Sequence, residues 1–132
     1  MSLRLFAVLT LVAGCGEVTL SAISVAPPGK TAVLDAGDHD LTLSRGTAFA
    51  FDCTANEGGY YGPCRDATAR IDDESVGSVY ASYLDSLAPV YQEGGAGQSG
   101  RTAFVVVGLQ AGQTEIHVET SDGDAMIDLR VE

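Results

Sequence analysis

The chain has 132 residues, the length of a single domain or of a domain with a short appendage. Its 18 acidic and seven basic side chains give a formal net charge of -11. Because such a chain repels phosphate backbones, nucleic acid is excluded as a partner.

The N-terminal stretch MSLRLFAVLTLVAGC has the order of an export signal. Arg4 and the free amine form a short basic start, an apolar run covers residues 5–12, and small residues follow. A run of eight residues is too short to cross about 30 Å of hydrocarbon as a helix that rises about 1.5 Å per residue. We therefore expect export rather than a membrane-spanning helix.

The tetrapeptide VAGC at residues 12–15 resembles the lipobox of bacterial lipoprotein precursors. The resemblance implies that residues 1–14 are removed as a signal peptide and that the Cys15 thiol receives a diacylglyceryl group. The new amino terminus is then usually acylated too, and two or more chains anchor a protein stably. In the sorting rule of enteric bacteria an aspartate after this cysteine favours the inner membrane, so Gly16 favours the outer one. The alternatives are an ordinary secretory signal and a core strand that contains a cysteine.

Export would place Cys53 and Cys64 in an oxidising compartment, where a close pair of cysteines normally forms a disulfide. The stretch between them, TANEGGYYGP, is rich in glycine, so we expect the bridge to close an irregular loop. Such a bridge contributes about 3 kcal/mol in the chain-entropy model. Tyr60 and Tyr61 at the tip of this loop are either an aromatic binding surface or a cover for the end of the domain. A metal or redox site is disfavoured because there is no CxxC and neither histidine is close in sequence.

The apolar residues mostly follow a period of two, which predicts strands and no helix. In TAFAFDC, Phe49, Phe51 and Cys53 share one face, and Asp52 lies on the other. Turn residues about every ten positions favour an all-β sandwich. The expected strands cover residues 17–25, 31–35, 41–44, 47–53, 67–71, 76–84, 88–92, 101–108, 114–120 and 125–132.

The last two expected strands form a hairpin, with Asp122 and Gly123 as a two-residue type I′ turn. In this register His117 lies opposite Asp128 on the solvent side, and Val118 lies opposite Ile127. A slip of one residue would mix the two faces. The side chains expected to face the core are Ile116, Val118, Ile127, Leu129 and Val131.

Two segments, IDDESVGSV and FVVVGLQAGQTEIHVET, resemble bacterial Ig-like domains of the group 2 type. The resemblance implies an Ig-like β-sandwich over residues 27–132, after a lipidated N-terminus and first strand at 15–26. The chain lacks the tryptophan that is usual in this family, and Ile71 lies near the corresponding place. The cysteine loop and the stretch YQEGGAGQSGR look like insertions relative to the family. The two cysteines are too close in sequence for an antibody-type bridge. The matching residues are Asp73, Ser75, Val76, Val79, Val107, Gly108, Ala111, Gly112, Ile116 and Val118.

Several stretches resemble ligand-binding motifs. GAGQSG at residues 95–100 matches G-x-G-x-x-G, but a β-branched strand follows where a dinucleotide fold needs a helix, so we expect a loop. Asp38, His39 and Asp40 are adjacent and cannot all converge on one ion, so GDHD is expected to be a polar turn. IDDE and SDGD also read as turns, although a calcium site would form if they met at one end of the sandwich.

The sequence favours no enzyme, no cofactor and no metal site. His117 lies between Glu115 and Glu119 on its strand face, as a solvated cross-strand partner would, and no G-x-S-x-G elbow is present. We expect a lipid-anchored, non-catalytic envelope lipoprotein that binds or scaffolds a protein or polysaccharide. The alternatives are an accessory subunit of an envelope complex that docks by a sheet edge, a calcium-dependent adhesin, and a small hydrolase.

Overall fold

A computed structural model describes residues 17–84 and 101–132, and these residues form ten strands and no helix. The prediction of an all-β fold is confirmed. The strands are β1 (Glu17–Ala22), β2 (Ala32–Asp35), β3 (Asp40–Leu43), β4 (Ala48–Glu57), β5 (Tyr60–Pro63), β6 (Thr68–Ile71), β7 (Gly77–Leu84), β8 (Arg101–Gly108), β9 (Gly112–Thr120) and β10 (Gly123–Val131).

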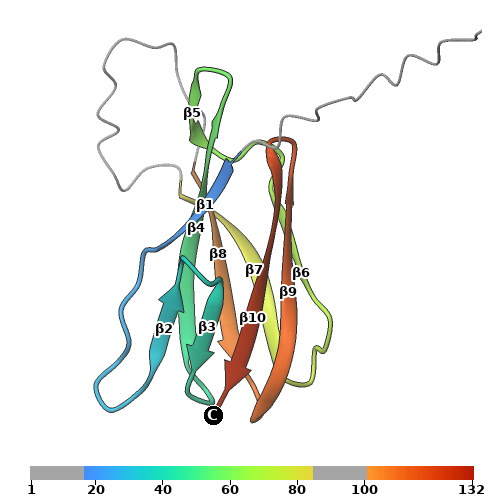
Figure 1. The fold of residues 1–132 in the computed structure, drawn as a ribbon. Coiled ribbons are helices and arrows are strands. Elements are labelled where there is room, and N and C mark those ends of the chain that lie inside the picture. The colour runs from blue at the N-terminus through green and yellow to red at the C-terminus, as the bar shows by residue number, and fades with distance from the viewer. Residues whose placement is uncertain (1–16, 85–100) are drawn as a thin grey trace, which may run out of the picture.

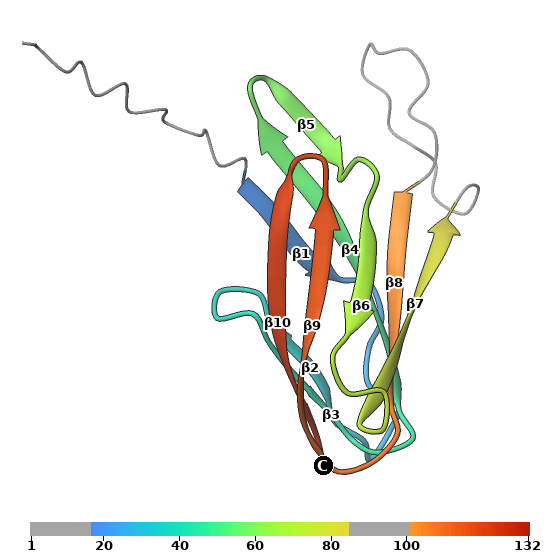
Figure 2. The same ribbon diagram turned by 90° about the vertical axis from the view of Figure 1, so that its right-hand side faces the viewer.

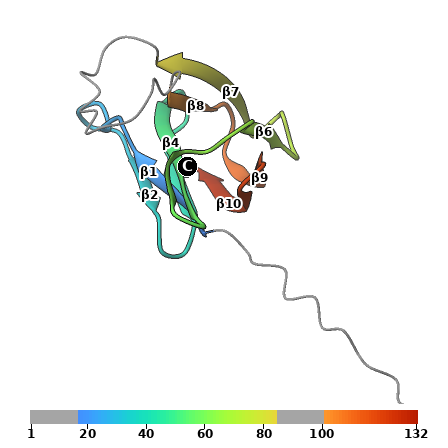
Figure 3. The same cartoon turned by 90° about the horizontal axis from the view of Figure 1, so that it is seen from above.

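The strands form two five-stranded sheets, which face each other as the layers of a sandwich (Figures 1, 2 and 3). Sheet A has the order β1-β4-β8-β7, and β5 also pairs with β4. Sheet B has the order β2-β3-β10-β9-β6. The β3–β10 pair is parallel, whereas the other strand pairs are antiparallel.

Inward side chains of both sheets form one core, as the period of two predicts. Phe49, Phe51 and Cys53 are buried on the inner face of β4, and the Phe51 and Phe104 rings lie 5.5 Å apart. Asp52, expected on the outer face of this strand, is also buried, with 1% of its surface exposed. The predicted core residues of the last hairpin, Ile116, Val118, Ile127, Leu129 and Val131, are all buried.

The pairing register of the β9–β10 hairpin differs from the predicted one. Val118 lies opposite Ala125 rather than Ile127, and His117 lies opposite Met126 rather than Asp128. The shift is two residues, and because a two-residue shift keeps every side chain on its face, the predicted faces are right although the pairs are wrong.

The local cause of this shift is the turn between the two strands. Thr120 pairs with Gly123, so Ser121 and Asp122 form the turn. The Thr120 hydroxyl accepts hydrogen bonds from the amides of Asp122 and Gly123, at 2.9 and 3.0 Å. A type I′ turn needs positive φ at both central residues, whereas the described non-glycine residues with positive φ are His39 and Asp66.

The stretch between the cysteines forms a β-hairpin, not the irregular loop that was expected. β4 continues to Glu57 and pairs with β5, and the strands are joined by Gly58 and Gly59. These glycines have φ of 56° and 86°, the positive values that a type I′ turn requires and that glycine adopts without strain. The composition that argued against strands therefore supplies the turn of a hairpin. Residues 54–63 are called the arm below.

The two segments that resemble Ig-like domains lie against each other. The Leu109 amide donates to the Val76 carbonyl at 2.8 Å. A Cβ atom at Gly112 would lie 3.0 Å from Val76 Cγ2, a tighter contact than a Cβ atom normally makes, so a larger residue would need Val76 to shift. The expected strand at 88–92 and the loop at 95–100 lie outside the described residues.

Candidate functional site

One end of the sandwich is held by the disulfide between Cys53 and Cys64, which confirms the predicted pairing. Cys53 lies on the inner face of β4, Cys64 directly follows β5, and their Cα atoms are 5.4 Å apart. Both cysteines are buried. The bridge therefore fixes the base of the arm to the sandwich core.

The two tyrosines of the arm have different environments. Tyr60 is partly buried against the core, and its hydroxyl donates to the Pro63 carbonyl at 2.8 Å. The Arg65 guanidinium lies 4.7 Å from the centre of the Tyr60 ring, within the range of a cation–π interaction. Tyr61 is 74% exposed. Tyr60 thus covers the sandwich end, and Tyr61 is available for contact.

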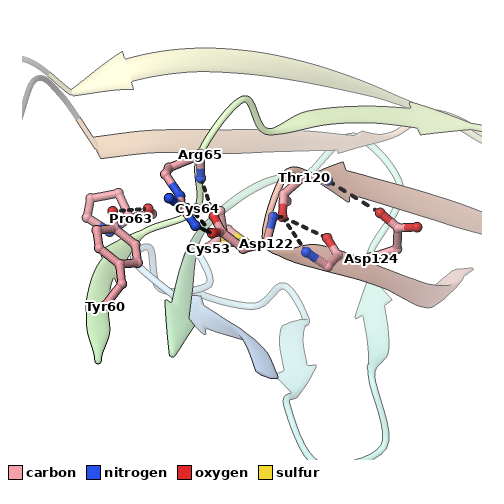
Figure 4. Close-up of a disulfide and its surroundings, with 9 residues drawn as sticks. Cys53, Tyr60, Pro63, Cys64, Arg65, Thr120, Asp122 and Asp124 are labelled. Carbon is pink, nitrogen blue, oxygen red and sulfur yellow. Dashed lines mark hydrogen bonds and ion pairs between the residues drawn. A yellow bond between two sulfur atoms is a disulfide. The ribbon is translucent and has the colours of Figure 1, made fainter. Parts of the chain in front are cut away.

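A polar clamp joins the segment after the arm to the β9–β10 turn (Figure 4). The Asp122 carboxylate accepts from the backbone amide and from Nε of Arg65, each at 2.7 Å, and also from Nη2. The Ser121 amide donates to the Arg65 carbonyl at 3.0 Å, and the Ser121 hydroxyl donates to the Asp66 carboxylate at 2.7 Å. The clamp therefore connects the two sheets at the arm end.

The clamp changes the acidity of its central carboxyl group. The Asp122 side chain is fully buried. Hydrogen bonds from the Arg65 side chain and then from its backbone amide lower the pKa of Asp122 below its ordinary value of 3.8, and they outweigh the opposing effect of burial.

This lowered pKa predicts acid sensitivity. Because the folded-state pKa is below the unfolded value, the clamp stabilises the fold fully above about pH 4 and is lost as the pH falls through the folded-state value. We expect the free energy of unfolding, measured by urea titration between about pH 5 and 2, to fall less steeply for Asp122→Asn than for the wild type. Equal slopes would contradict an ionised Asp122 in the fold.

A second group of polar side chains lies on the outer face of sheet B. His117 Nε2 is 3.0 Å from Asp72 Oδ2 and 3.7 Å from Glu115 Oε2. Asp72 directly follows β6, and its amide donates to the Glu115 carbonyl at 3.0 Å. The hydrogen bond with His117 is the main cause that lowers the pKa of Asp72. These three side chains are the group, among the described residues, that could hold a metal ion.

The acidic turns noted in the sequence do not meet. The Asp73 carboxylate accepts from the amide and hydroxyl of Ser75, at 2.9 and 2.6 Å, near the start of β9. Asp122 lies beyond the other end of β9. In GDHD, the Asp38 amide donates to Asp35 Oδ1 at 3.2 Å, and His39 has φ of 58°. This stretch forms the turn between β2 and β3, as expected.

The sequence-based reasoning missed both polar groups. Arg65 and Asp122 are separated by 57 positions, and Asp72 and His117 by 45. No local motif marks either pair, because each pair forms only when its strands align.

The proposed lipidation site and signal peptide cannot be placed in the structure. Cys15 and the signal peptide at residues 1–14 lie outside the described residues. No helix long and apolar enough to cross a membrane occurs within residues 17–84 and 101–132.

Comparison with known proteins shows the fold alone. No protein-family model and no curated protein matches the sequence. Among solved structures, domains 5–6 of the S-layer protein SbsC are similar with a TM-score of 0.53 and 18% identity, over 82% of this chain and 44% of that one. A larger SbsC structure, residues 31–844, gives a TM-score of 0.52 and 16% identity over 94% of this chain and 21% of that one. The chain thus spans less than half of these proteins, and it shares with their domains an all-β architecture.

Proposed function

We propose that this chain is a lipid-anchored, non-catalytic protein of a bacterial cell envelope, which binds or scaffolds a protein or polysaccharide partner. The observation that carries the proposal is the tetrapeptide VAGC at residues 12–15, which follows a basic start and an apolar run. In this order the cysteine stands where the lipobox of an exported precursor has its lipidated residue.

The fold agrees with this proposal. The similar solved structures are domains of an S-layer protein, and a β-sandwich of the same architecture suits a structural or binding role in an envelope. The disulfide suits an exported chain, because disulfides persist in oxidising compartments. It also leaves the described residues without a free thiol nucleophile.

The position of Cys15 in the sequence would orient the domain. Gly16 is the one residue between Cys15 and β1, so an extended chain spans about 7 Å between the anchor and the first strand. Glu17 pairs with Asn56, in the first strand of the arm. In Figure 1 the arm and the β9–β10 turn lie at this same end. Lipidation would therefore hold the arm, with its exposed Tyr61, beside the membrane, where tyrosine suits the interface.

A Cys15→Ala variant tests the anchor. In the native host we expect the wild type to fractionate with membranes. It should remain there after a high-salt wash, because salt screens electrostatic attraction but does not weaken the insertion of acyl chains into the bilayer. Cys15→Ala should appear in the soluble fraction. A Ser2→Ala variant, which leaves the lipobox intact, serves as the control. Membrane retention and normal maturation of Cys15→Ala would contradict the proposal.

A second candidate function, docking by strand addition, is favoured by β7, which is an edge strand of sheet A among the described residues. In the described part of the chain β7 pairs with β8 alone, and its sequence GSVYASYL contains no charge and no proline. Such an edge can accept an extended segment from another protein. The exposed Tyr80 on this strand adds an aromatic contact.

A charge on this edge tests the docking function. Ser82 is exposed on β7, so Ser82→Lys should leave stability nearly unchanged but should hinder strand addition. In native membranes we expect chemical cross-linking of the wild type to give a specific adduct between this chain and its partner. The adduct should be absent for Ser82→Lys and present for Ser75→Lys, because Ser75 is exposed but lies outside the strand. Equal adducts in both variants would exclude docking at β7.

A further inference from the structure

Three potential metal ligands converge on the outer face of sheet B. Asp72, Glu115 and His117 each present one ligand atom, and these atoms lie within 4.8 Å of one another. We propose that the three side chains bind a late first-row divalent metal ion of the Zn²⁺ type. The inference depends on described residues alone and not on the lipid anchor.

The distances suit such an ion. A tetrahedral ion with bonds of about 2.0 to 2.2 Å holds its ligand atoms about 3.3 Å apart. The observed distances from His117 Nε2, 3.0 Å to Asp72 and 3.7 Å to Glu115, lie on either side of this value. The ligand atoms of Asp72 and Glu115 lie within 4.8 Å of each other, and both carboxylates are about half exposed, so their side chains have room to adjust to an ion.

The surrounding backbone and side chains hold the donors in place. Glu115 and His117 are two residues apart on β9, so they share a face. Arg70 Nη1 donates to Asp72 Oδ1 at 2.8 Å and leaves Oδ2 towards His117. An outer partner that orients a metal ligand in this way is typical of metal sites. The His117 side chain is only 22% exposed, which limits its motion.

Among the described residues, carboxylates outnumber cations around this group, in which Arg70 pairs with Asp72. Asp72 and Glu115 lie opposite each other across the β6–β9 pair, and like charges in such positions destabilise a sheet. On the other side of Glu115 the register places Asp128, and beside Asp128 it places Asp40. A divalent cation would reverse the repulsion between the two carboxylates, and the neighbouring acids would attract it.

The donor set identifies the class of metal. Imidazole nitrogen suits Zn²⁺, Cu²⁺ and Ni²⁺, whereas Ca²⁺ takes six to eight oxygen ligands. One nitrogen and two carboxylates therefore favour a zinc-like ion with an open position for water. No local sequence pattern marks this group, because Asp72 reaches His117 only through the β6–β9 pairing.

Calorimetric titration with Zn²⁺ alone tests the proposal. The sample is the full-length, tag-free chain in which Cys15→Ser removes the cysteine outside the disulfide. We expect one ion per chain, no binding by His117→Ala, and affinities at least about tenfold weaker for Asp72→Asn and Glu115→Gln. His39→Ala, which removes the other histidine, should bind as the parent chain does. His117→Ala should remain folded, because His117 lies on the outer face of β9, outside the core, and its partner Asp72 is about half exposed.

Two kinds of result would overturn the proposal of a zinc site. Absence of Zn²⁺ binding would show that the three side chains form an ion-pair group only, and would overturn the proposal. Equal binding by His117→Ala, or displacement of Zn²⁺ by a modest excess of Ca²⁺, would assign the binding to the acidic surface and would also overturn it. A change in the NMR resonances of the His117 imidazole at one equivalent, without a change at His39, would support it.

Discussion

The Val118→Asp variant is expected to be severely destabilised, by at least about 3 kcal/mol. Val118 is completely buried in the core between the sheets. Burial of a valine contributes about 1.5 to 3 kcal/mol, and an unpaired carboxyl group at the same place adds a desolvation cost. Urea unfolding followed by circular dichroism measures the change.

The matched control for this variant is Met126→Asp. Met126 lies on the neighbouring strand but on the outer face, and it is 49% exposed. Its replacement should cost about 1 kcal/mol or less. If both variants lost the same stability, the assignment of inner and outer faces in this hairpin would be wrong.

The Asp122→Ala variant is expected to lose about 2 to 4 kcal/mol. The change removes the charged acceptor of the Arg65 side chain and leaves the Arg65 backbone amide without that partner. It also releases the β9–β10 turn from the segment that follows the arm. We therefore expect faster hydrogen exchange at Arg65 and Ser121, in addition to a lower urea midpoint.

Asp124→Ala provides the comparison. Asp124 is exposed in the same hairpin, and its carboxylate accepts one long hydrogen bond, 3.4 Å from the Thr120 amide. Its loss should change stability by about 0.5 kcal/mol or less. An Asp122→Ala variant as stable as Asp124→Ala would show that the clamp does not hold the two sheets together.

The side chains of the β9–β10 hairpin that face the core were predictable from the sequence, whereas the residues that pair across the hairpin were not. Alternation placed Ile116, Val118 and Ile127 in the core because each strand has one apolar face. The same alternation cannot distinguish registers that differ by two residues, and the Thr120 hydroxyl selects the observed turn. Register in a hairpin thus depends on turn contacts that a hydrophobic pattern does not contain.

The candidate sites were less predictable than the fold. The disulfide could be expected because both cysteines lie close together in sequence and the N-terminal stretch resembles an export signal. The Arg65–Asp122 clamp and the His117 group require strands from distant parts of the chain to align. The arm was misjudged because a Gly-Gly pair was read as irregular, although the same pair fits a type I′ turn.

Intact mass spectrometry of the protein extracted from native membranes tests the central claim most directly. We predict one species that contains residues 15–132. Its mass should be two units lower than that of the reduced chain, because the disulfide removes two hydrogen atoms. It should also be higher by the mass of a diacylglyceryl group, with or without an N-acyl chain. Alkaline ester hydrolysis should release the two ester-linked acyl chains as fatty acids and leave the thioether-linked glyceryl group, with any amide-linked N-acyl chain, on Cys15, which would confirm that the added mass is lipid. An unprocessed chain of residues 1–132, or a cleaved chain without acyl mass, would contradict the account.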